Sequence, residues 1–161
     1  MRLRPVRQTD LPVMFVLQQD PESNRLAVTY PRTESGFQQH WMQALSDPTV
    51  TARAILSEDL FVGWIAVYPS DGLSLVGYWL GREFWGRGIA SRALMLLLNQ
   101  VRKRPLFARV AVSNGASVRV LQKCGFQIAG YRDCPEDDRY PACEEVILSL
   151  EDFTGGSAAN P

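Results

Sequence analysis

Two glycines that are separated by one residue stand directly before a run of helix-forming residues, in the segment EFWGRGIAS. Gly86 and Gly88 have no side chains, so the backbone N–H groups around them can turn towards one point and approach a ligand closely. The first N–H groups of a helix lack partners within the helix and carry partial positive charge. This arrangement is typical of a site for an anion such as a pyrophosphate. Further positive charge is close by in the sequence, on Arg82, Arg87 and Arg92.

Two other phosphate-binding motifs do not fit this segment. A dinucleotide fingerprint requires a third glycine at its own spacing and an alternating pattern of parallel strands. A phosphate loop of the nucleotide-triphosphatase kind requires Gly-Lys-Ser or Gly-Lys-Thr. The sequence contains neither. A glycine pair alone is equally compatible with a plain tight turn, so the rest of the sequence must decide between a turn and an anion site.

The elements that would position this segment follow from hydrophobic periodicity and capping residues. Alternation predicts an edge strand over 2–7, further strands over 50–58, 60–68, 73–80 and 106–112, and a closing hairpin over 126–134 and 143–150. Helices are predicted over 11–20, 31–48, 86–101 and 114–124. This order predicts an α+β fold, with a central, mostly antiparallel mixed β-sheet flanked by helices. The helix between strands 73–80 and 106–112 predicts one parallel, right-handed β-α-β crossover.

Composition narrows the class of protein. The chain has 161 residues and a formal net charge of zero, which argues against a general nucleic-acid binder because such a binder needs a basic surface. No apolar run reaches membrane-spanning length, and the first residues lack the apolar core of a signal peptide, so we expect a cytoplasmic protein. We expect a single domain over 1–153 and a disordered tail over 154–161.

The three cysteines give no sign of a metal site. Cys124, Cys134 and Cys143 are odd in number and have no metal-like spacing, so we expect reduced thiols and no metal. Cys134 and Cys143 could face each other across the closing hairpin, but the sequence does not predict a disulfide bond.

A second segment decides the reading of the glycine pair. WGRGIASRAL, followed by VAVSNGASVRVLQKCGF, resembles the GNAT superfamily of N-acetyltransferases, whose pyrophosphate loop reads Gln/Arg-x-x-Gly-x-Gly/Ala. The matching positions are Trp85, Gly88 and Ala90. Tryptophan at the first position departs from the general motif. A tryptophan at this position resembles the branch of the superfamily that contains ribosomal-protein N-terminal (alanine/serine) acetyltransferases. The segments GYWLGREFWGRGIA and LQKCGF also resemble that branch, and the resemblance spans nearly the whole chain.

The resemblance implies that acetyl-CoA is the cosubstrate and that a primary amine, such as a peptide or protein N-terminal amine, accepts the acetyl group directly in a ternary complex. It leaves open an acetyltransferase for a small amine (an antibiotic, a polyamine or an amino acid), and a non-catalytic acyl-CoA-binding module. It implies no binding to nucleic acid or membrane, and relatives are often homodimers.

The resemblance also assigns roles within the site. Strands 73–80 and 106–112 would splay apart and admit the pantetheine arm, which would pair with backbone groups of one strand, while the Leu80 amide polarises the thioester carbonyl. The implied catalytic residues are Leu80, Asn114 and Ser117. The implied cofactor-binding residues are Tyr78, Trp79, Leu80, Trp85, Gly86, Arg87, Gly88, Ile89, Ala90, Ser91, Asn114, Arg119 and Lys123.

Simpler roles stand beside two of these assignments. Asn114 has the residue type of a helix cap, which needs only local geometry, and could serve as a cap alone or as a cap and a ligand contact. Ser117 could protonate the leaving thiolate or could merely face solvent.

Two positions depart from the family pattern. Many relatives carry a tyrosine acid where this chain has Leu121, and some carry a glutamate base where it has Arg109. Leucine cannot donate a proton and arginine stays protonated, so the proton path is open. Other carboxylates could act through water, although each is more often a solvated charge: Glu83, Asp133, Glu144 and Glu145.

The acceptor side is less well defined by the sequence. The acidic run PEDDRYPACEE (135–145) could attract a cationic amine or form a solvated hairpin loop. Tyr30, Phe37 and Trp41 could line the acceptor mouth, but core packing is the more common role of such residues. His40 is expected to be structural or exposed rather than catalytic.

Overall fold

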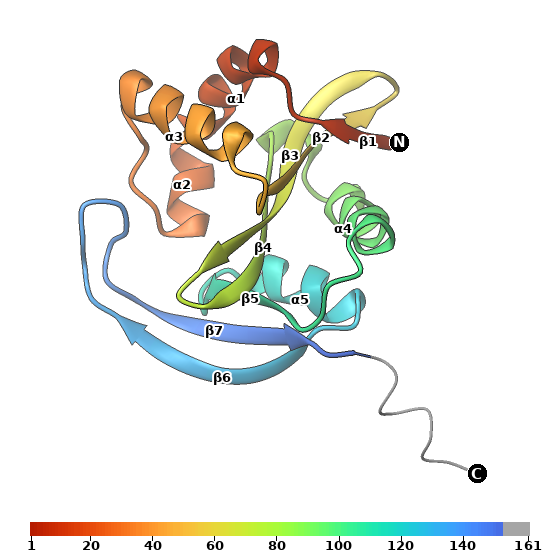
Figure 1. Cartoon of the computed structure of the whole chain (residues 1–161). Coiled ribbons are helices and arrows are strands. Elements are labelled where there is room, and N and C mark those ends of the chain that lie inside the picture. Colours follow the sequence, from red (N-terminus) through yellow and green to blue (C-terminus); the bar gives the residue numbers. More distant parts are fainter. Residues whose placement is uncertain (153–161) are drawn as a thin grey trace.

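The computed structural model describes residues 1–152, and Figure 1 shows a central sheet with helices on both of its faces. The strands are β1 (Arg2–Pro5), β2 (Thr51–Ser57), β3 (Leu60–Ser70), β4 (Leu73–Leu80), β5 (Leu106–Ala111), β6 (Gln127–Cys134) and β7 (Cys143–Leu150). The helices are α1 (Leu11–Gln18), α2 (Pro21–Ala27), α3 (Glu34–Ser46), α4 (Ile89–Gln100) and α5 (Gly115–Lys123), with short 3-10 helices η1 (Gln8–Asp10) and η2 (Arg82–Phe84). The tail predicted over 154–161 lies outside the described residues.

The seven strands form one mixed sheet in the order β1-β2-β3-β4-β5-β7-β6. Neighbouring strands are antiparallel except for β4 and β5, which run parallel and are connected through α4. The predicted α+β fold with one parallel β-α-β crossover is therefore confirmed. The first strand also lies at an edge of the sheet, as predicted.

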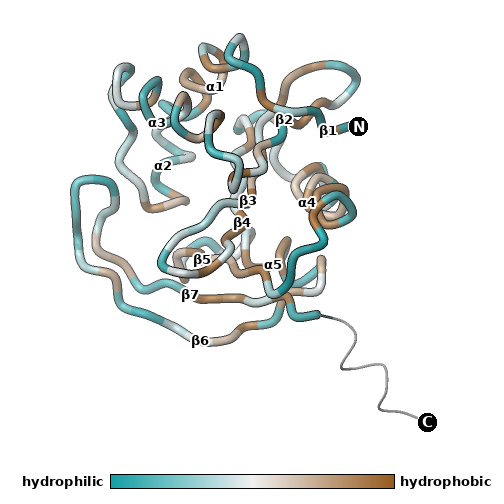
Figure 2. Tube along the Cα trace, viewed as in Figure 1, coloured by the Kyte–Doolittle hydropathy of each residue, from teal (hydrophilic) through white to brown (hydrophobic). Residues whose placement is uncertain are grey.

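Alternate residues of the central strands point to opposite faces of the sheet and fill two hydrophobic cores. On β3, Ile65 and Val67 belong to the core beneath α4 and α5, whereas Trp64 and Ala66 belong to the core beneath α1 and α3. Figure 2 shows apolar residues concentrated on the central strands and on α4, while the outer loops are largely hydrophilic. The sheet is thus the middle of three layers. Among residues 1–152, no helix combines the length and the apolar character needed to cross a bilayer.

Helix α2 is an element that the sequence patterns did not predict. Its sequence, PESNRLA, has no repeated apolar face, and the helix is stabilised by capping interactions at its two ends instead. The Asp20 side chain accepts the N–H of Ser23 at 3.0 Å, Pro21 is the first helical residue, and Val28 ends the helix with a left-handed φ of 54°. Capping signals in DPES, rather than periodicity, could have found this helix.

Helix α5 begins and ends as its sequence predicts. Asn114 caps the start, where its Oδ1 atom accepts a backbone N–H at 3.3 Å. At the other end Gly125 has a φ of 98°, and the N–H groups of Gly125 and Phe126 bond back to carbonyl oxygens of the last turn. This pattern folds Phe126 back against the helix, where its side chain is fully buried.

The Asp10 carboxylate ties β1 to η1, and we expect its replacement to destabilise the fold. It accepts hydrogen bonds from the Arg4 guanidinium at 2.7 and 2.8 Å and from the N–H of Arg7 at 2.7 Å. Asp10→Asn removes the charge opposite a mostly buried guanidinium, so the free energy of unfolding at pH 7 should fall by about 2 kcal/mol in urea titrations.

The same carboxylate gives the effect a pH dependence. The hydrogen bonds from Arg4 hold the pKa of Asp10 below its ordinary value, so its contribution is present above the unfolded pKa of about 4 and is lost as pH falls through the folded value. The difference between wild type and Asp10→Asn should therefore shrink at pH 3. Asp59→Asn is the matched control, because Asp59 pairs with Arg2 at 3.2 Å on the exposed surface and should change stability by less than about 0.5 kcal/mol. Equal losses in the two variants would contradict this account.

Candidate functional site

The parallel strands β4 and β5 form a wedge. They are paired at a single position, Leu75 with Phe107, near the start of both strands. Beyond it β4 stays paired with β3 as far as Leu80, while β5 pairs with β7, so the two strands diverge. Gly81 donates its N–H to Val62 of β3 at 2.9 Å. Because N–H groups alternate sides along a strand, the N–H of Leu80 points to the opposite edge, into the wedge.

The start of α4 presents N–H groups that have no hydrogen-bond partner among residues 1–152. The helix begins at Ile89 rather than at residue 86 as predicted, because Gly86 and Gly88 have φ values of 75° and 73°, outside the right-handed helical region. Throughout residues 1–152, no hydrogen bond is recorded from the N–H groups of residues 88–91. These donors and the helix dipole together favour an anion at this end of α4.

The nearby arginines each have a contact with another residue, and their contribution to the anion site stays a prediction. Arg82 pairs with Asp20 at 3.2 Å. The guanidinium of Arg87 lies over the ring of Phe84, 5.8 Å from its centre. Arg92 donates to loop carbonyl oxygens, including that of Arg87 at 3.3 Å, and so keeps these oxygens turned towards itself. Asp20 offsets the charge of Arg82, whereas Arg87 and Arg92 keep their positive charge beside the backbone N–H groups.

A cavity of about 370 Å³, here called the first cavity, lies between the wedge, the start of α4 and the side of α5. The residues that the sequence analysis assigned to the site and that line this cavity are Tyr78, Trp79, Leu80, Trp85, Gly86, Gly88, Ile89, Ala90, Ser91, Asn114, Ser117, Arg119 and Lys123. Arg87 is not among the lining residues. The structure thus gathers segments that are far apart in the sequence, while the roles assigned to them stay predictions.

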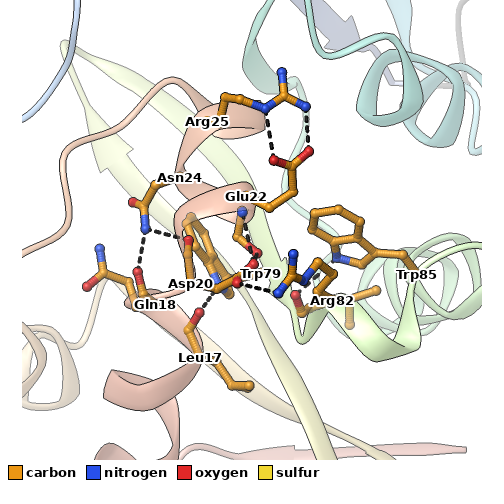
Figure 3. A network of polar contacts seen from close by, with 11 residues as sticks. Leu17, Gln18, Asp20, Glu22, Asn24, Arg25, Trp79, Arg82 and Trp85 are labelled. Carbon is orange, nitrogen blue, oxygen red and sulfur yellow. Dashed lines mark hydrogen bonds and ion pairs between the residues drawn. The ribbon is translucent and has the colours of Figure 1, made fainter.

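Helix α2 closes one side of the first cavity, a contribution that the sequence analysis missed. Figure 3 shows how the segment before α2 is tied to the end of β4. The indole N–H of Trp79 donates to the carbonyl oxygen of Leu17 at 3.1 Å, and Arg82 pairs with Asp20. The same strand end therefore carries the Leu80 amide and anchors the helix beside it. The lining residues from α2 are Ser23, Leu26 and Ala27.

The wall formed by α5 carries polar and basic side chains. Asn114 caps the helix through Oδ1, while its Nδ2 group has no partner among residues 1–152 and is open to a ligand. Ser117 Oγ lies 2.7 Å from Tyr78 Oη, which gives Ser117 a bonded partner on β4 and contradicts the alternative that it merely faces solvent. Arg119 and Lys123, one turn apart, place positive charge along the same wall.

A second cavity, of about 560 Å³, lies on the other face of the sheet. It is lined by the end of α2, the β3–β4 turn, β5 and the β6–β7 loop, and Ala27 belongs to the walls of both cavities. On β5, Ala108 and Val110 are in the core beneath α4 and α5, so Arg109 between them points to the second cavity. Figure 1 shows the β6–β7 loop reaching towards α2, and the N–H of Tyr30 donates to the backbone carbonyl oxygen of Arg139 in that loop at 2.8 Å.

The charges of the second cavity are largely paired with one another. Arg109 pairs with Asp71 at 2.9 Å. Arg132 pairs with Glu145 at 3.3 Å, and Glu145 also accepts a hydrogen bond from the Cys134 thiol. Two carboxylates from the sequence analysis, Asp133 and Glu145, thus reach this cavity, whereas Glu83 and Glu144 are exposed and line neither cavity.

Other residues that the sequence singled out have structural positions. Phe37 and Trp41 are buried in the core beneath α1 and α3, which confirms packing as their role. His40 lies edge-on against Trp41, and burial together with the charges of Arg32 and Arg139 lowers the pKa of His40 to about 4. Its imidazole is therefore neutral at pH 7.

The three cysteines are free, and Cys134 lies directly opposite Cys143 in the β6–β7 pairing, as the hairpin predicts. Burial raises the pKa of both thiols, so they stay protonated at neutral pH. Within residues 1–152, no group of three or more His, Cys, Asp or Glu side chains is placed to hold a metal ion. Leu121, at the position of the family's tyrosine acid, is buried in the core.

Comparison with known proteins places these features in a family. Residues 1–127 match the model of the acetyltransferase (GNAT) domain. An uncharacterized N-acetyltransferase, p20, from Bacillus licheniformis is 26% identical over 141 residues, which cover 80% of this chain and 79% of that protein.

Solved structures share the fold at low sequence identity. Spermidine N-acetyltransferase from Vibrio cholerae, in complex with CoA and spermine, matches with a TM-score of 0.80 and 14% identity, covering 93% of this chain and 94% of that chain. A ribosomal-protein-alanine N-acetyltransferase from Brucella melitensis matches with a TM-score of 0.78 and 18% identity, covering 94% of this chain and 100% of that chain.

Proposed function

Since the chain belongs to the GNAT acetyltransferases, we propose that it binds acetyl-CoA and transfers the acetyl group to the N-terminal amine of a peptide or protein. The chain is an N-acetyltransferase by family, and the amine that it modifies is the open part of the question. We place this reaction in the cytoplasm, where acetyl-CoA and ribosomal proteins occur together.

Acetyl-CoA fits the first cavity part by part. Its pyrophosphate would lie at the unpartnered N–H groups of residues 88–91, with Arg119 and Lys123 facing the phosphates. Its pantetheine amides would pair along the free edge of β4, as an added strand does. The thioester oxygen would accept the N–H of Leu80, which would stabilise the negative charge that develops on that oxygen during attack.

The proposed reaction is direct attack of the amine on the thioester. No cysteine of the described residues lines the first cavity, which argues against a covalent acetyl-enzyme there. The acceptor would approach from the second cavity, because the two cavities adjoin at Ala27 on opposite faces of the opened sheet. Holding a neutral amine in line with the thioester would supply much of the rate acceleration.

The ion pairs in the second cavity are the reason for proposing an acceptor with one amine. A polyamine or an aminoglycoside presents several ammonium groups and needs several free carboxylates. Here Asp71 and Glu145 are neutralised by arginines, and Asp137 accepts two N–H groups of its own loop at 2.7 and 2.8 Å. Asp133 is the lining carboxylate, among the described residues, that has no recorded partner. With two of the four lining carboxylates paired to arginines, the remaining negative charge suits an acceptor with one amine better than a polycation.

The test is release of CoA thiol from acetyl-CoA, followed by absorbance, with a panel of acceptors. We expect turnover with peptides that have a free N-terminal amine and none with the same peptides blocked at that amine. A preference for spermidine, an aminoglycoside or free amino acids would replace this proposal by a small-molecule acetyltransferase. Tight CoA binding with no thiol release from any acceptor would favour a binding module.

A further inference from the structure

Two hydroxyl groups meet between β4 and α5, and the cofactor-binding roles described above do not explain the Tyr78 hydroxyl. Tyr78 Oη and Ser117 Oγ are 2.7 Å apart, and both residues line the first cavity. Tyr78 and Leu80 are two residues apart on β4, so their side chains share the face towards α5. The pair therefore lies next to the strand end whose N–H would hold the thioester oxygen.

The chain lacks the proton donor that many relatives have. Leu121 stands at that position, 1% exposed, and has no proton to give. A thiolate that leaves during acyl transfer is stabilised by a donor close to the sulfur. In the first cavity, the phenol of Tyr78 and the alcohol of Ser117 are hydrogen bonded to each other, and both carry a proton that could be donated.

We propose that Ser117 is the acid and that Tyr78 positions it. The Tyr78 hydroxyl bonds to Ser117 Oγ, orients the serine proton towards the sulfur of acetyl-CoA, and replaces that proton as it leaves. The inference rests on the proposed function. The phenol is the stronger acid of the two, so it donates and the serine oxygen accepts. The remaining serine proton is then free to point into the cavity.

The step balances as follows. The amine nitrogen forms the C–N bond, the C–S bond breaks, and its electron pair stays on sulfur. The Ser117 hydroxyl proton moves to sulfur, and the Tyr78 hydroxyl proton moves to Ser117 Oγ. The proton that the amine nitrogen loses returns through water to the Tyr78 oxygen, so the products are the N-acetylated amine and CoA thiol.

The surroundings of Tyr78 keep its hydroxyl protonated between turnovers. Burial raises the pKa of Tyr78 above its ordinary value, while the bond to Ser117 lowers it and the neighbouring Cys124 raises it. Arg119 and Lys123 are the charged side chains that line the same cavity from α5. The donor form is therefore the resting form at neutral pH.

Tyr78→Phe and Ser117→Ala test the pair, because each removes a hydroxyl and little else. We expect each variant to lower kcat by about 100-fold. The dissociation constant of CoA, measured by calorimetry, should stay within about 2-fold, since no phosphate or pantetheine contact is lost. Ser117→Thr should recover most of kcat because it restores a hydroxyl. The matched control is Tyr131→Phe on β6, whose ring is exposed and lines neither cavity.

The double variant separates a pair that acts as a unit from two independent residues. Combined Tyr78→Phe and Ser117→Ala should be no slower than the worse single variant. Wild-type kcat in Tyr78→Phe, or a double variant slowed by the product of the single effects, would overturn the inference. Thiol release by the wild type is measured first, and it tests the proposed function separately from Tyr78.

A readout without turnover completes the test. Ionisation of Tyr78 is followed by alkaline difference absorbance, with Tyr78→Phe as the reference. Ser117→Ala should move the titration midpoint to higher pH, because the ionised Tyr78 oxygen can accept the Ser117 hydroxyl and this hydrogen bond lowers the pKa of Tyr78. An unchanged midpoint would show that the two hydroxyls are not bonded in solution and would also overturn the inference.

Discussion

Gly88→Glu should reduce the affinity for CoA by about 100-fold or more in calorimetry. Gly88 is the residue before α4, and a Cβ atom built on it meets nothing within 4 Å, so the new side chain has room to enter the anion site. Its carboxylate would then lie close to the position proposed for the pyrophosphate. Like charges about 4 Å apart near a protein surface repel by about 4 kcal/mol, which is more than enough for this loss.

The control for Gly88→Glu must reproduce both its charge and its backbone strain. Gly72→Glu does so, because Gly72 has a φ of 76°, close to the 73° of Gly88, and a Cβ there also meets nothing within 4 Å. It lies in the turn between β3 and β4, away from the first cavity. Both variants should lose a similar 1–2 kcal/mol, in rough terms, of unfolding free energy. Unchanged CoA affinity in Gly88→Glu would remove the pyrophosphate assignment.

Gly63→Ala should be the most destabilising small substitution in the sheet. A Cβ at this position would lie 2.1 Å from the carbonyl oxygen of Trp79 and 3.0 Å from the Cα of Leu80, both backbone atoms that cannot rotate away. β3 and β4 must therefore separate at the end of β4. We expect a loss of at least about 3 kcal/mol in chemical unfolding.

The same substitution reaches the site, because the displaced peptide carries the N–H proposed to hold the thioester oxygen. If Gly63→Ala still folds, kcat should fall together with stability. Gly77→Ala is the matched control on β4: its Cβ would meet the ring of Tyr68 at an ordinary 3.6 Å, and its backbone φ is not in the left-handed region. It should be neutral or slightly stabilising. Equal stability of the two variants would refute the steric argument.

The sheet was predictable because its signal is local. Alternating apolar residues on β3 and β4, joined by a short turn, specify antiparallel neighbours, and the two faces then follow from the period of two. Helix α5 was predictable for a similar reason, because Asn114 and Gly125 mark its two ends by their own backbone preferences.

What the sequence did not predict depends on contacts between distant segments. Periodicity missed α2, which is held by caps and by the pairing of Asp20 with Arg82, more than sixty residues away in the chain. Nothing in the sequence indicated that the guanidinium of Arg87 would lie over the ring of Phe84. The Tyr78 side chain was overlooked because the motif assigns only its backbone, although alternation along β4 puts it on the face of α5.

The single pairing of Leu75 with Phe107 also affects the mechanical behaviour of the molecule. It divides the sheet into two rigid ladders, β1–β4 and β5–β7, that share one short seam. Beyond the seam the ladders are held by apolar side chains such as Leu94 and Val110, whose attraction has no preferred direction. Small sliding of one ladder against the other therefore strains no backbone hydrogen bonds beyond those of this single pairing, so the sheet should be more compliant along this line than between its other strands.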